Sequence, residues 1–277
     1  MQTTQQVNHF KSTIPWGDLK VARNKHPYLN SLFQRLSVNA NTDLTVADFV
    51  TVLIKSTTRK NVRLPKFLNQ SEIVSNGRYY EQIIHEEGCV PTRENSWHDF
   101  FNALIWLQFP KTKQLLNQLH VEQISQHGVH PRTLMRNQIT HFDECGLVLV
   151  GTDPSARVIV DALRNHDWHQ ALFEKRDAWH QVIHPLVFGH ANLEMLLDPF
   201  LSLTGKWLYI ECEGINNLDN IDSLLTSHIQ QNNLFSAKGQ LKPLPLLGVP
   251  SWHPNQDLNF YAQTQYFRPL RNIPRSA

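Results

Sequence analysis

The segment Arg93-Glu-Asn-Ser-Trp-His-Asp-Phe-Phe-Asn-Ala-Leu-Ile-Trp-Leu-Gln-Phe109 decides the fold of this chain, and Pro110 ends it. From Phe100 onward nearly every side chain is apolar, so a helix here would have no polar face to present to water. A helix of that kind lies in the interior of a domain. The segment therefore predicts a buried central helix.

The first turns of this predicted helix carry polar side chains. They are His98, Asp99 and Asn102, with Arg93 just upstream. Residues three and four apart share a helix face, so Asn102 points roughly the same way as His98 and Asp99. Polar groups on a buried helix need hydrogen-bond partners, a metal or a ligand. These four residues are therefore candidate catalytic residues.

Structural interpretations compete with this functional one. Ser96 and Asp99 fit a capping box, in which Ser96 is the N-cap and Asp99 reaches back to a free backbone N–H. That interpretation explains Asp99 and leaves His98 and Asn102 open. His98 is then a buried histidine bonded to a carbonyl or carboxylate, a metal ligand or a general base.

Composition sets limits on the class of protein. The chain has 277 residues, 41% of them hydrophobic and 18% charged, which is typical of a globular protein with a sizeable core. A net charge of +2 provides no overall field that attracts nucleic acid or anionic membranes. The three cysteines are far apart, without a CxxC pair, which favours a reducing compartment over a disulfide framework.

The first residues are polar and lack the layout of a secretion signal. No apolar run approaches the ~18 residues that span a bilayer. We therefore expect a soluble, cytoplasmic protein without a membrane partner. Phosphate-binding loops of the GxxxxGK[ST] or GxGxxG type and a GxSxG nucleophile motif are also absent from the sequence.

The spacing of apolar residues predicts the other elements. Helices are expected within 14–36 (interrupted by Pro27), 46–54, 79–84, 110–124, 154–179, 187–197 and 218–229, and a strand at 206–212. In residues 136–150, two β-prone runs flank Asp143-Glu-Cys-Gly146 and predict a hairpin. We expect a mostly α (α+β) fold with a small antiparallel β insert. Residues 1–277 would form a single domain with a helical N-terminal part (1–70) and an extended Pro-rich C-terminal segment (241–254).

Motifs spread over most of the chain resemble one family. They are Val90-Pro-Thr-Arg93, Trp97-His-Asp-Phe-Phe-Asn-Ala-Leu104, Phe109-Pro110, Lys113, Thr140, Phe142-Asp-Glu144, Gly146, Phe188-Gly-His-Ala191, Glu194, Leu247-Gly-Val-Pro250 and Phe267-Arg-Pro269. Together they resemble the bacterial domain-of-unknown-function family 3025, with a family core over residues 75–271. The chain departs from the pattern at Ser251, where we expect glycine before Trp252. The resemblance implies a soluble bacterial protein and no particular reaction.

Two further pairs of residues could contribute to a site. His190 and Glu194 lie four apart in a predicted helix, so both can address one metal, although a surface His–Glu pair worth roughly a few tenths of a kcal/mol is the alternative. Asp143 and Glu144 lie near the predicted turn, where acidic residues suit the backbone. One of them points inward if the preceding run is a strand.

The arginines are the expected partners of these acids. Arg132 or Arg136 would be the counter-ion of Asp143 or Glu144. Arg93 could pair with Asp99, with Asp143 or with an anion of the substrate.

The first functional hypothesis is a metal-dependent hydrolase. Its catalytic candidates are Arg93, His98, Asp99, Asn102, Asp143 and Glu144, and its metal-ligand candidates are His98, Asp143, His190 and Glu194. A mixed nitrogen and oxygen set suits zinc, manganese or iron better than calcium or magnesium. A metal-bound water could attack a phosphoester or amide while Arg93 holds the developing charge.

The second hypothesis is a non-enzymatic binding protein that contacts RNA or another protein. It rests on the basic residues Lys55, Arg59, Lys60, Arg63 and Lys66, on the tail residues Arg268, Arg271 and Arg275, and on Trp252 and Tyr261 for stacking. The alternative for the basic stretch is a solvated loop.

Overall fold

The N-terminal part of the protein is helical, as the spacing predicts. In the computed structural model, which describes residues 12–56 and 63–270, the helices here are α1 (Leu19–Arg23), α2 (Pro27–Arg35) and α3 (Val46–Ser56). Pro27 begins α2. Proline is tolerated there because the N–H at the first helical position has no hydrogen-bond partner within the helix. The Oγ1 of Thr45 accepts from the Asp48 N–H at 3.2 Å and caps α3.

His26, just before α2, makes the stability of this part depend on pH. Its Nδ1 accepts from the Tyr28 N–H at 3.2 Å, and its Nε2 lies 3.1 Å from the Trp252 carbonyl oxygen. Burial lowers the pKa of His26 to about 4. Since the folded pKa lies below that of the unfolded chain, the stabilisation is present above pH ~6.5 and is lost as the pH falls through ~4, on the order of 3 kcal/mol in total.

Urea unfolding between pH 7.5 and 4.5 checks this expectation. His26→Asn is the control variant, because asparagine can also cap a helix but does not titrate. The stability of the wild type should fall more steeply with acid than that of the variant. Equal slopes would contradict the role assigned to His26.

A short parallel pair of strands follows, which the sequence did not predict. β1 (Lys66–Asn69) pairs with β2 (Cys89–Thr92), and α4 (Tyr80–Glu87) lies between them in the chain after a 3-10 turn at Gln70–Glu72. Gly88 ends α4 in the left-handed conformation (φ 63°) that glycine adopts without strain.

The central helix is where the sequence predicts it. α5 (Trp97–Gln108) is followed by α6 (Pro110–His127), which Pro110 begins. The aromatic side chains of Phe100 and Phe101 are completely buried. Ser96 caps α5 by accepting from the Asp99 N–H at 3.2 Å, which is one half of the predicted capping box; the Asp99 carboxylate accepts from the Arg93 N–H instead of that of Ser96.

The hairpin predicted at 136–150 is wrong, although its second run is a strand. α7 (Leu134–Cys145) runs directly into β3 (Gly146–Gly151), so the first predicted strand and most of the predicted turn are helical. Arg136, Ile139 and Phe142 lie three apart and form the buried face of α7. Gly146 allows the abrupt change from helix to strand, because a Cβ there would lie 2.4 Å from the Phe142 carbonyl oxygen.

The main sheet contains both parallel and antiparallel pairs of strands. The predicted small antiparallel insert is therefore wrong. β3, β4 (Ile183–Val187), β5 (Thr204–Glu211) and β6 (Lys242–Pro245) pair in the order β4-β3-β5-β6. β3 and β5 are parallel, and the outer pairs are antiparallel. All six residues of β3 are buried, as befits an inner strand covered on both faces.

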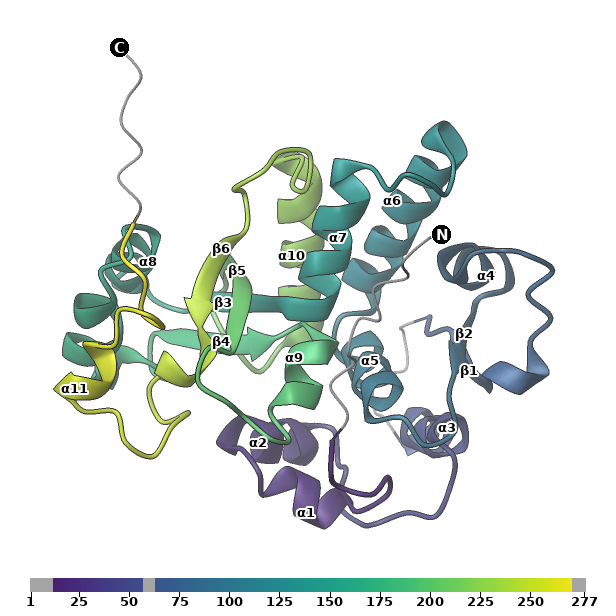
Figure 1. Cartoon of the computed structure of the whole chain (residues 1–277), viewed down its shortest axis with the longest axis horizontal. Helices are drawn as coiled ribbons and strands as arrows, with labels where there is room; N and C mark the ends of the chain where they lie inside the picture. The colour runs from purple at the N-terminus through teal and green to yellow at the C-terminus, as the bar shows by residue number, and fades with distance from the viewer. Residues whose placement is uncertain (1–11, 57–62, 271–277) are drawn as a thin grey trace, which may run out of the picture.

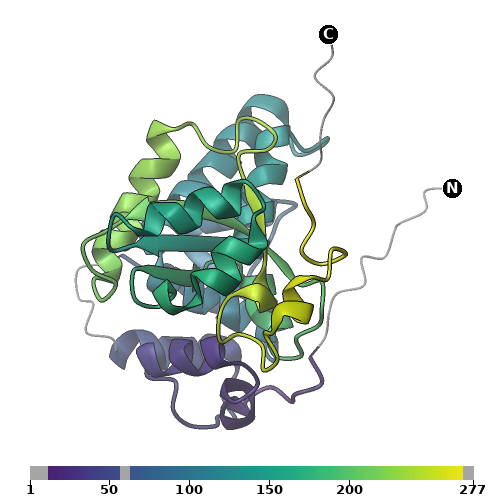
Figure 2. The same cartoon turned by 90° about the vertical axis from the view of Figure 1, so that its left-hand side faces the viewer.

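Helices surround this sheet in Figure 1, and the purple N-terminal helices lie below it in both views (Figures 1 and 2). The remaining helices are α8 (Ala156–Arg164), a π-helical turn (His169–Glu174), a 3-10 turn (Arg176–Ala178), α9 (His190–Met195), α10 (Leu218–Gln231) and α11 (Leu258–Tyr261). An α+β fold is therefore confirmed.

The Pro-rich C-terminal segment has local structure of its own. It supplies the edge strand β6, where proline is tolerated, and then a 3-10 turn at Leu246–Gly248. Ser251 has a φ of 70°, in the left-handed region that favours glycine, which explains why glycine is expected there.

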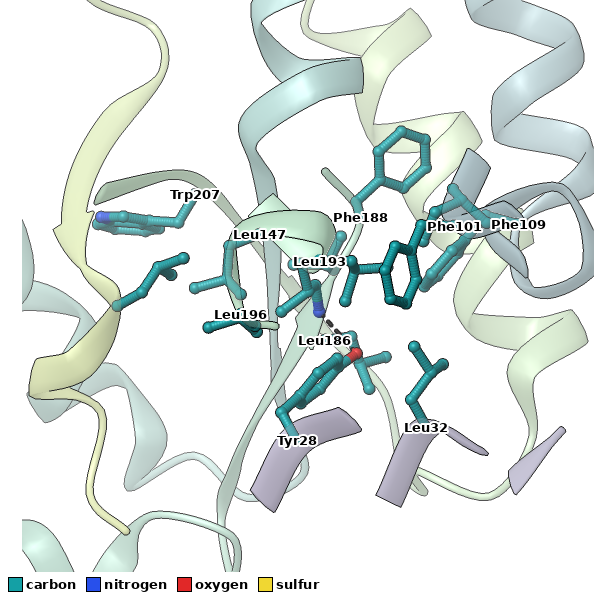
Figure 3. Close-up of a cluster of buried hydrophobic side chains, with 14 of the residues drawn as sticks. Tyr28, Leu32, Phe101, Phe109, Leu147, Leu186, Phe188, Leu193, Leu196 and Trp207 are labelled. Carbon is teal, nitrogen blue, oxygen red and sulfur yellow. Dashed lines mark hydrogen bonds between the residues drawn. The ribbon is translucent and has the colours of Figure 1, made fainter. Parts of the chain in front are cut away.

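A continuous hydrophobic cluster joins the N-terminal helices, the sheet and α5. Figure 3 shows Tyr28 among the core side chains Leu186 and Leu193, and its hydroxyl accepts from the Val187 N–H at 2.8 Å. No helix in the two described ranges combines the length and apolar character that a membrane crossing requires. The single-domain organisation stays a prediction.

Candidate functional site

Three helices carry the polar residues of the candidate site. α9 packs against both α5 and α7, and α7 packs against α6, an arrangement visible in Figure 1. His98 comes from the first turn of α5, Asp143 and Glu144 from the last turn of α7, and His190 and Glu194 from α9. Segments far apart in the sequence thus supply one set of nitrogen and oxygen atoms.

Gly189 allows α9 to approach α7 this closely. A Cβ on Gly189 would lie 2.5 Å from the Glu144 carbonyl oxygen and 2.5 Å from the Gly146 nitrogen. The Gly189 N–H donates to the Gly146 carbonyl at 2.8 Å, which holds the two turns together. His190 therefore begins α9 directly beside the end of α7.

Gly189→Ala is expected to destabilise the fold by about 1–3 kcal/mol, because backbone atoms must move to accept the methyl group. The free energy of unfolding in urea measures this effect. Gly214→Ala is the matched control, since a Cβ at Gly214 meets nothing within 4 Å. Equal stability of the two variants would contradict the close packing described here.

Two histidines and one carboxylate face a common point. The Nε2 atoms of His98 and His190 are 3.0 Å apart, and the Glu144 Oε2 lies 3.4 Å from the Nε2 of His190 and 3.9 Å from that of His98. Three atoms at these separations share a point roughly 2 Å from each, which is the length of Zn–N and Zn–O bonds. Among the described residues, these three form the group with metal-ligand spacing.

A carboxylate lies on the far side of each imidazole ring. The Glu194 Oε2 is 3.1 Å from the Nδ1 of His98, and the Asp143 Oδ2 is 3.8 Å from the Nδ1 of His190. The Nδ1 of His190 is buried and has no hydrogen-bond partner among the described residues. Both rings therefore have the Nδ1 side toward an acid and the Nε2 side toward the common point.

Burial decides the protonation of this group. It lowers the pKa of His190 to about 3 and raises that of Glu144. Burial would also lower the pKa of His98, but the carboxylates of Glu194 and Glu144 outweigh it and raise that pKa. His190 is accordingly a neutral imidazole near pH 7, the form in which histidine binds metals.

A buried lysine, Lys113, is the counter-ion of Asp143, so the prediction of Arg132 or Arg136 in this role is wrong. The Lys113 Nζ donates to the Asp143 Oδ1 at 2.5 Å and to the Asn102 Oδ1 at 2.9 Å. Burial alone would raise the pKa of Asp143, but the ammonium group of Lys113 outweighs it and lowers that pKa. Asp143 is therefore an anion.

Arg93 pairs with Asp99, which is one of the three partners predicted for it. The Asp99 carboxylate accepts from the backbone N–H of Arg93 at 2.7 Å and from its Nε and Nη2 at 3.0 and 2.8 Å. Asp99 thus reaches back past Ser96 to Arg93. The Asn102 Nδ2 donates to the Tyr80 hydroxyl at 3.2 Å, which ties α5 to α4.

The site opens into two cavities. One of about 720 Å³ is lined by His98, Glu144 and His190 and extends toward α4 and α6. A second, of about 560 Å³, lies toward Trp16 and Trp97. His98 and Arg93 line both cavities.

Sequence reasoning missed part of the site. Lys113, Asn117 and His120 are buried on one face of α6 and lie near Asp143 or Glu81. Their spacing of four and three was the available signal, because it gives one helix face three polar residues among apolar neighbours. Lys113 belongs to the motifs that resemble the family, but the resemblance implies no role for it.

The residues of the competing hypotheses lie elsewhere. Trp252 and Tyr261 are buried, so their rings are not available for stacking on bases. Arg59, Lys60, Arg271 and Arg275 lie outside the described residues.

The fold and the site together define an α+β protein with a two-histidine, one-carboxylate cluster between three helices. The chain belongs to a family described as protein of unknown function (DUF3025), whose model matches residues 65–271. No curated protein and no solved structure matches the chain.

Proposed function

We propose that this protein is a metal-dependent hydrolase in which His98, Glu144 and His190 hold one divalent transition metal. The supporting observation is the separation of their ligand atoms by 3.0, 3.4 and 3.9 Å around a common point. This set includes Glu144, whereas Asp143 and Glu194 lie behind the histidines. Asp143 and Glu194 are therefore proposed to orient ligands and not to bind the metal.

The protonation of the two rings supports a shared cation. If each ring directs its Nδ1–H at a carboxylate, both Nε2 lone pairs face each other at 3.0 Å. Two lone pairs at that distance repel unless a proton or a metal lies between them. Metal-bound histidines commonly donate the other ring N–H to a carboxylate, as proposed here for His98 and Glu194.

The ligand set suits zinc, manganese or iron and leaves coordination positions open. A metal in such a site supplies a water of lowered pKa that can attack a phosphoester or amide. Asp99 would hold Arg93 at the rim, with the Arg93 Nη1, which has no partner among the described residues, facing the developing charge. Asn102 would hold Lys113 against Asp143.

The test is metal analysis and hydrolysis by the full chain, purified without an affinity tag. We expect about one equivalent of transition metal. Hydrolysis of 4-nitrophenyl phosphate or of a peptide 4-nitroanilide should be lost in chelator and restored by zinc, manganese or iron. Metal-free protein that neither binds these ions nor gains activity from them would overturn the proposal.

Glu194→Gln is expected to weaken metal binding by about tenfold, at the lower end of the effect of outer-shell partners. Glutamine keeps the size of Glu194 but removes the charge that polarises His98. Competition with a fluorescent chelator measures the affinity. Glu86→Gln, at an exposed position that pairs with Arg78, is the control, and equal affinities would contradict the role of Glu194.

A further inference from the structure

The larger cavity has an arginine whose charge is not paired. Arg78, Arg93 and Arg132 all line it. Arg78 pairs with Glu86 and Glu87, and Arg93 pairs with Asp99. Among the described residues, Arg132 instead donates to two hydroxyl groups, those of Tyr79 and Thr140, and forms no ion pair.

A second guanidinium group lies behind this wall. Arg136 is completely buried, and its Nη1 donates to the Val129 carbonyl at 2.5 Å. Its Nε and Nη2 have no hydrogen-bond partner among the described residues. Arg132 and Arg136 lie over the Tyr79 ring, with 5.7 and 5.3 Å from guanidinium carbon to ring centre. A buried cation without an anionic partner is costly, so this wall attracts negative charge.

An unpartnered buried imidazole faces the same cavity. His120 is 4% exposed and lines the cavity, and its Nδ1 has no hydrogen-bond partner among the described residues. Burial lowers the pKa of His120 to about 4. The ring is therefore neutral near pH 7 and has one N–H to donate, so it adds a hydrogen-bonding group without adding charge.

The carboxylate of Glu81 does not neutralise the charge of Arg132. Glu81 also lines the cavity, but its Oε2 accepts from the Asn117 Nδ2 at 2.8 Å. Burial is the main cause that raises the pKa of Glu81. The Glu81 carboxylate is thus turned toward α6 and forms no ion pair with Arg132.

The structure assigns to Arg132, Tyr79 and His120 a subsite for a phosphate group of the substrate. This assignment rests on the proposed function, because it names phosphate esters as the substrate class of the hydrolase. The Thr140 hydroxyl donates to the Arg136 carbonyl at 2.9 Å and accepts from Arg132, so it positions Arg132. Arginine forms paired, charge-assisted hydrogen bonds with phosphate oxygens. The donors come from three places, just before α4, in α6 and just before α7, and therefore suit the three free oxygens of a phosphate better than the two of a carboxylate.

Calorimetric titration of inorganic phosphate into the full, chelator-treated chain tests this subsite without any metal. The wild type should bind one phosphate saturably, and Arg132→Gln should weaken binding about tenfold or more. Arg78→Gln is the matched control, because Arg78 lines the same cavity but is already paired. It should change the affinity less than twofold.

Three results would overturn the proposed subsite. The first is that the wild type shows no saturable binding of phosphate, and the second is that it binds acetate as tightly as phosphate. The third result is an equal effect of Arg132→Gln and Arg78→Gln on the affinity, with folding verified by circular dichroism. Because the titration contains chelator, a failure of the metal site leaves its result unchanged. Conversely, metal binding without phosphate binding would reject the subsite alone.

Discussion

Lys113→Met is expected to cost about 3 kcal/mol of folding free energy. Lys113 is buried, and its ammonium group satisfies both Asp143 and Asn102. Methionine fills much of the same volume but leaves the Asp143 carboxylate without its counter-ion in a mostly buried site. The free energy of unfolding in urea at pH 7 measures the loss.

A control variant and a double variant test whether the loss of stability comes from the unpaired Asp143 carboxylate. Lys111→Met changes an exposed lysine on the same helix, whose Nζ donates to the Ser223 hydroxyl at 2.8 Å, and should cost less than 1 kcal/mol by the range for exposed polar contacts. Adding Asp143→Asn to Lys113→Met should recover part of the loss, because the unpaired charge is removed. A double variant as unstable as the sum of the single ones would contradict the pairing.

His98→Ala is expected to weaken metal binding by more than the ~100-fold that outer-shell changes cause. The His98 Nε2 faces the point shared with His190 and Glu144, and its side chain is 27% exposed, so the fold should survive its truncation. Chelator competition measures the affinity, and urea unfolding of the metal-free protein measures stability. A loss of about 1–3 kcal/mol without any change in metal affinity would indicate a purely structural histidine.

His127→Ala provides the control for this experiment. His127 ends α6 and is exposed, so its removal takes one imidazole from the protein without touching the site. Metal affinity should remain that of the wild type. If His127→Ala and His98→Ala lowered the affinity equally, the bound metal would lie elsewhere.

The central helix could be predicted from the sequence for a physical reason. A run without a polar face is compatible with one environment, and Ser96 and Pro110 mark where the helix starts and stops. The same pattern drew attention to His98 and Asn102, because polar atoms on a buried helix must find partners. Their catalytic or metal-binding role stays a prediction.

The end of α7 could not be predicted in this way. Asp143 and Glu144 precede Gly146, and that composition is typical of a turn between strands. The burial of Ile139 and Phe142 at three-residue spacing favours helix, and tertiary packing decides between the two patterns. In the predicted hairpin Asp143 and Glu144 would lie in the turn. At the end of α7, Asp143 lies beside the Nδ1 of His190, and Glu144 lies beside the Nε2 atoms of His190 and His98.

Lys113 shows a second limit of the sequence. A lysine is expected in water, and only the contact of α6 with α7 provides the carboxylate that makes its burial tolerable. The juxtaposition of Gly189 with Glu144 depends in the same way on the packing of α9 against α7. Long-range contacts therefore carry the information that local periodicity lacks.

The most direct test of the metal centre is anomalous diffraction from crystals of the full chain soaked with zinc, with data collected on both sides of the zinc absorption edge. We predict one strong anomalous peak roughly 2 Å from the Nε2 atoms of His98 and His190 and from a carboxylate oxygen of Glu144. The peak should be missing in crystals of His98→Ala. Crystals that show no peak between these three side chains, or show it only at other surface histidines, would contradict the account.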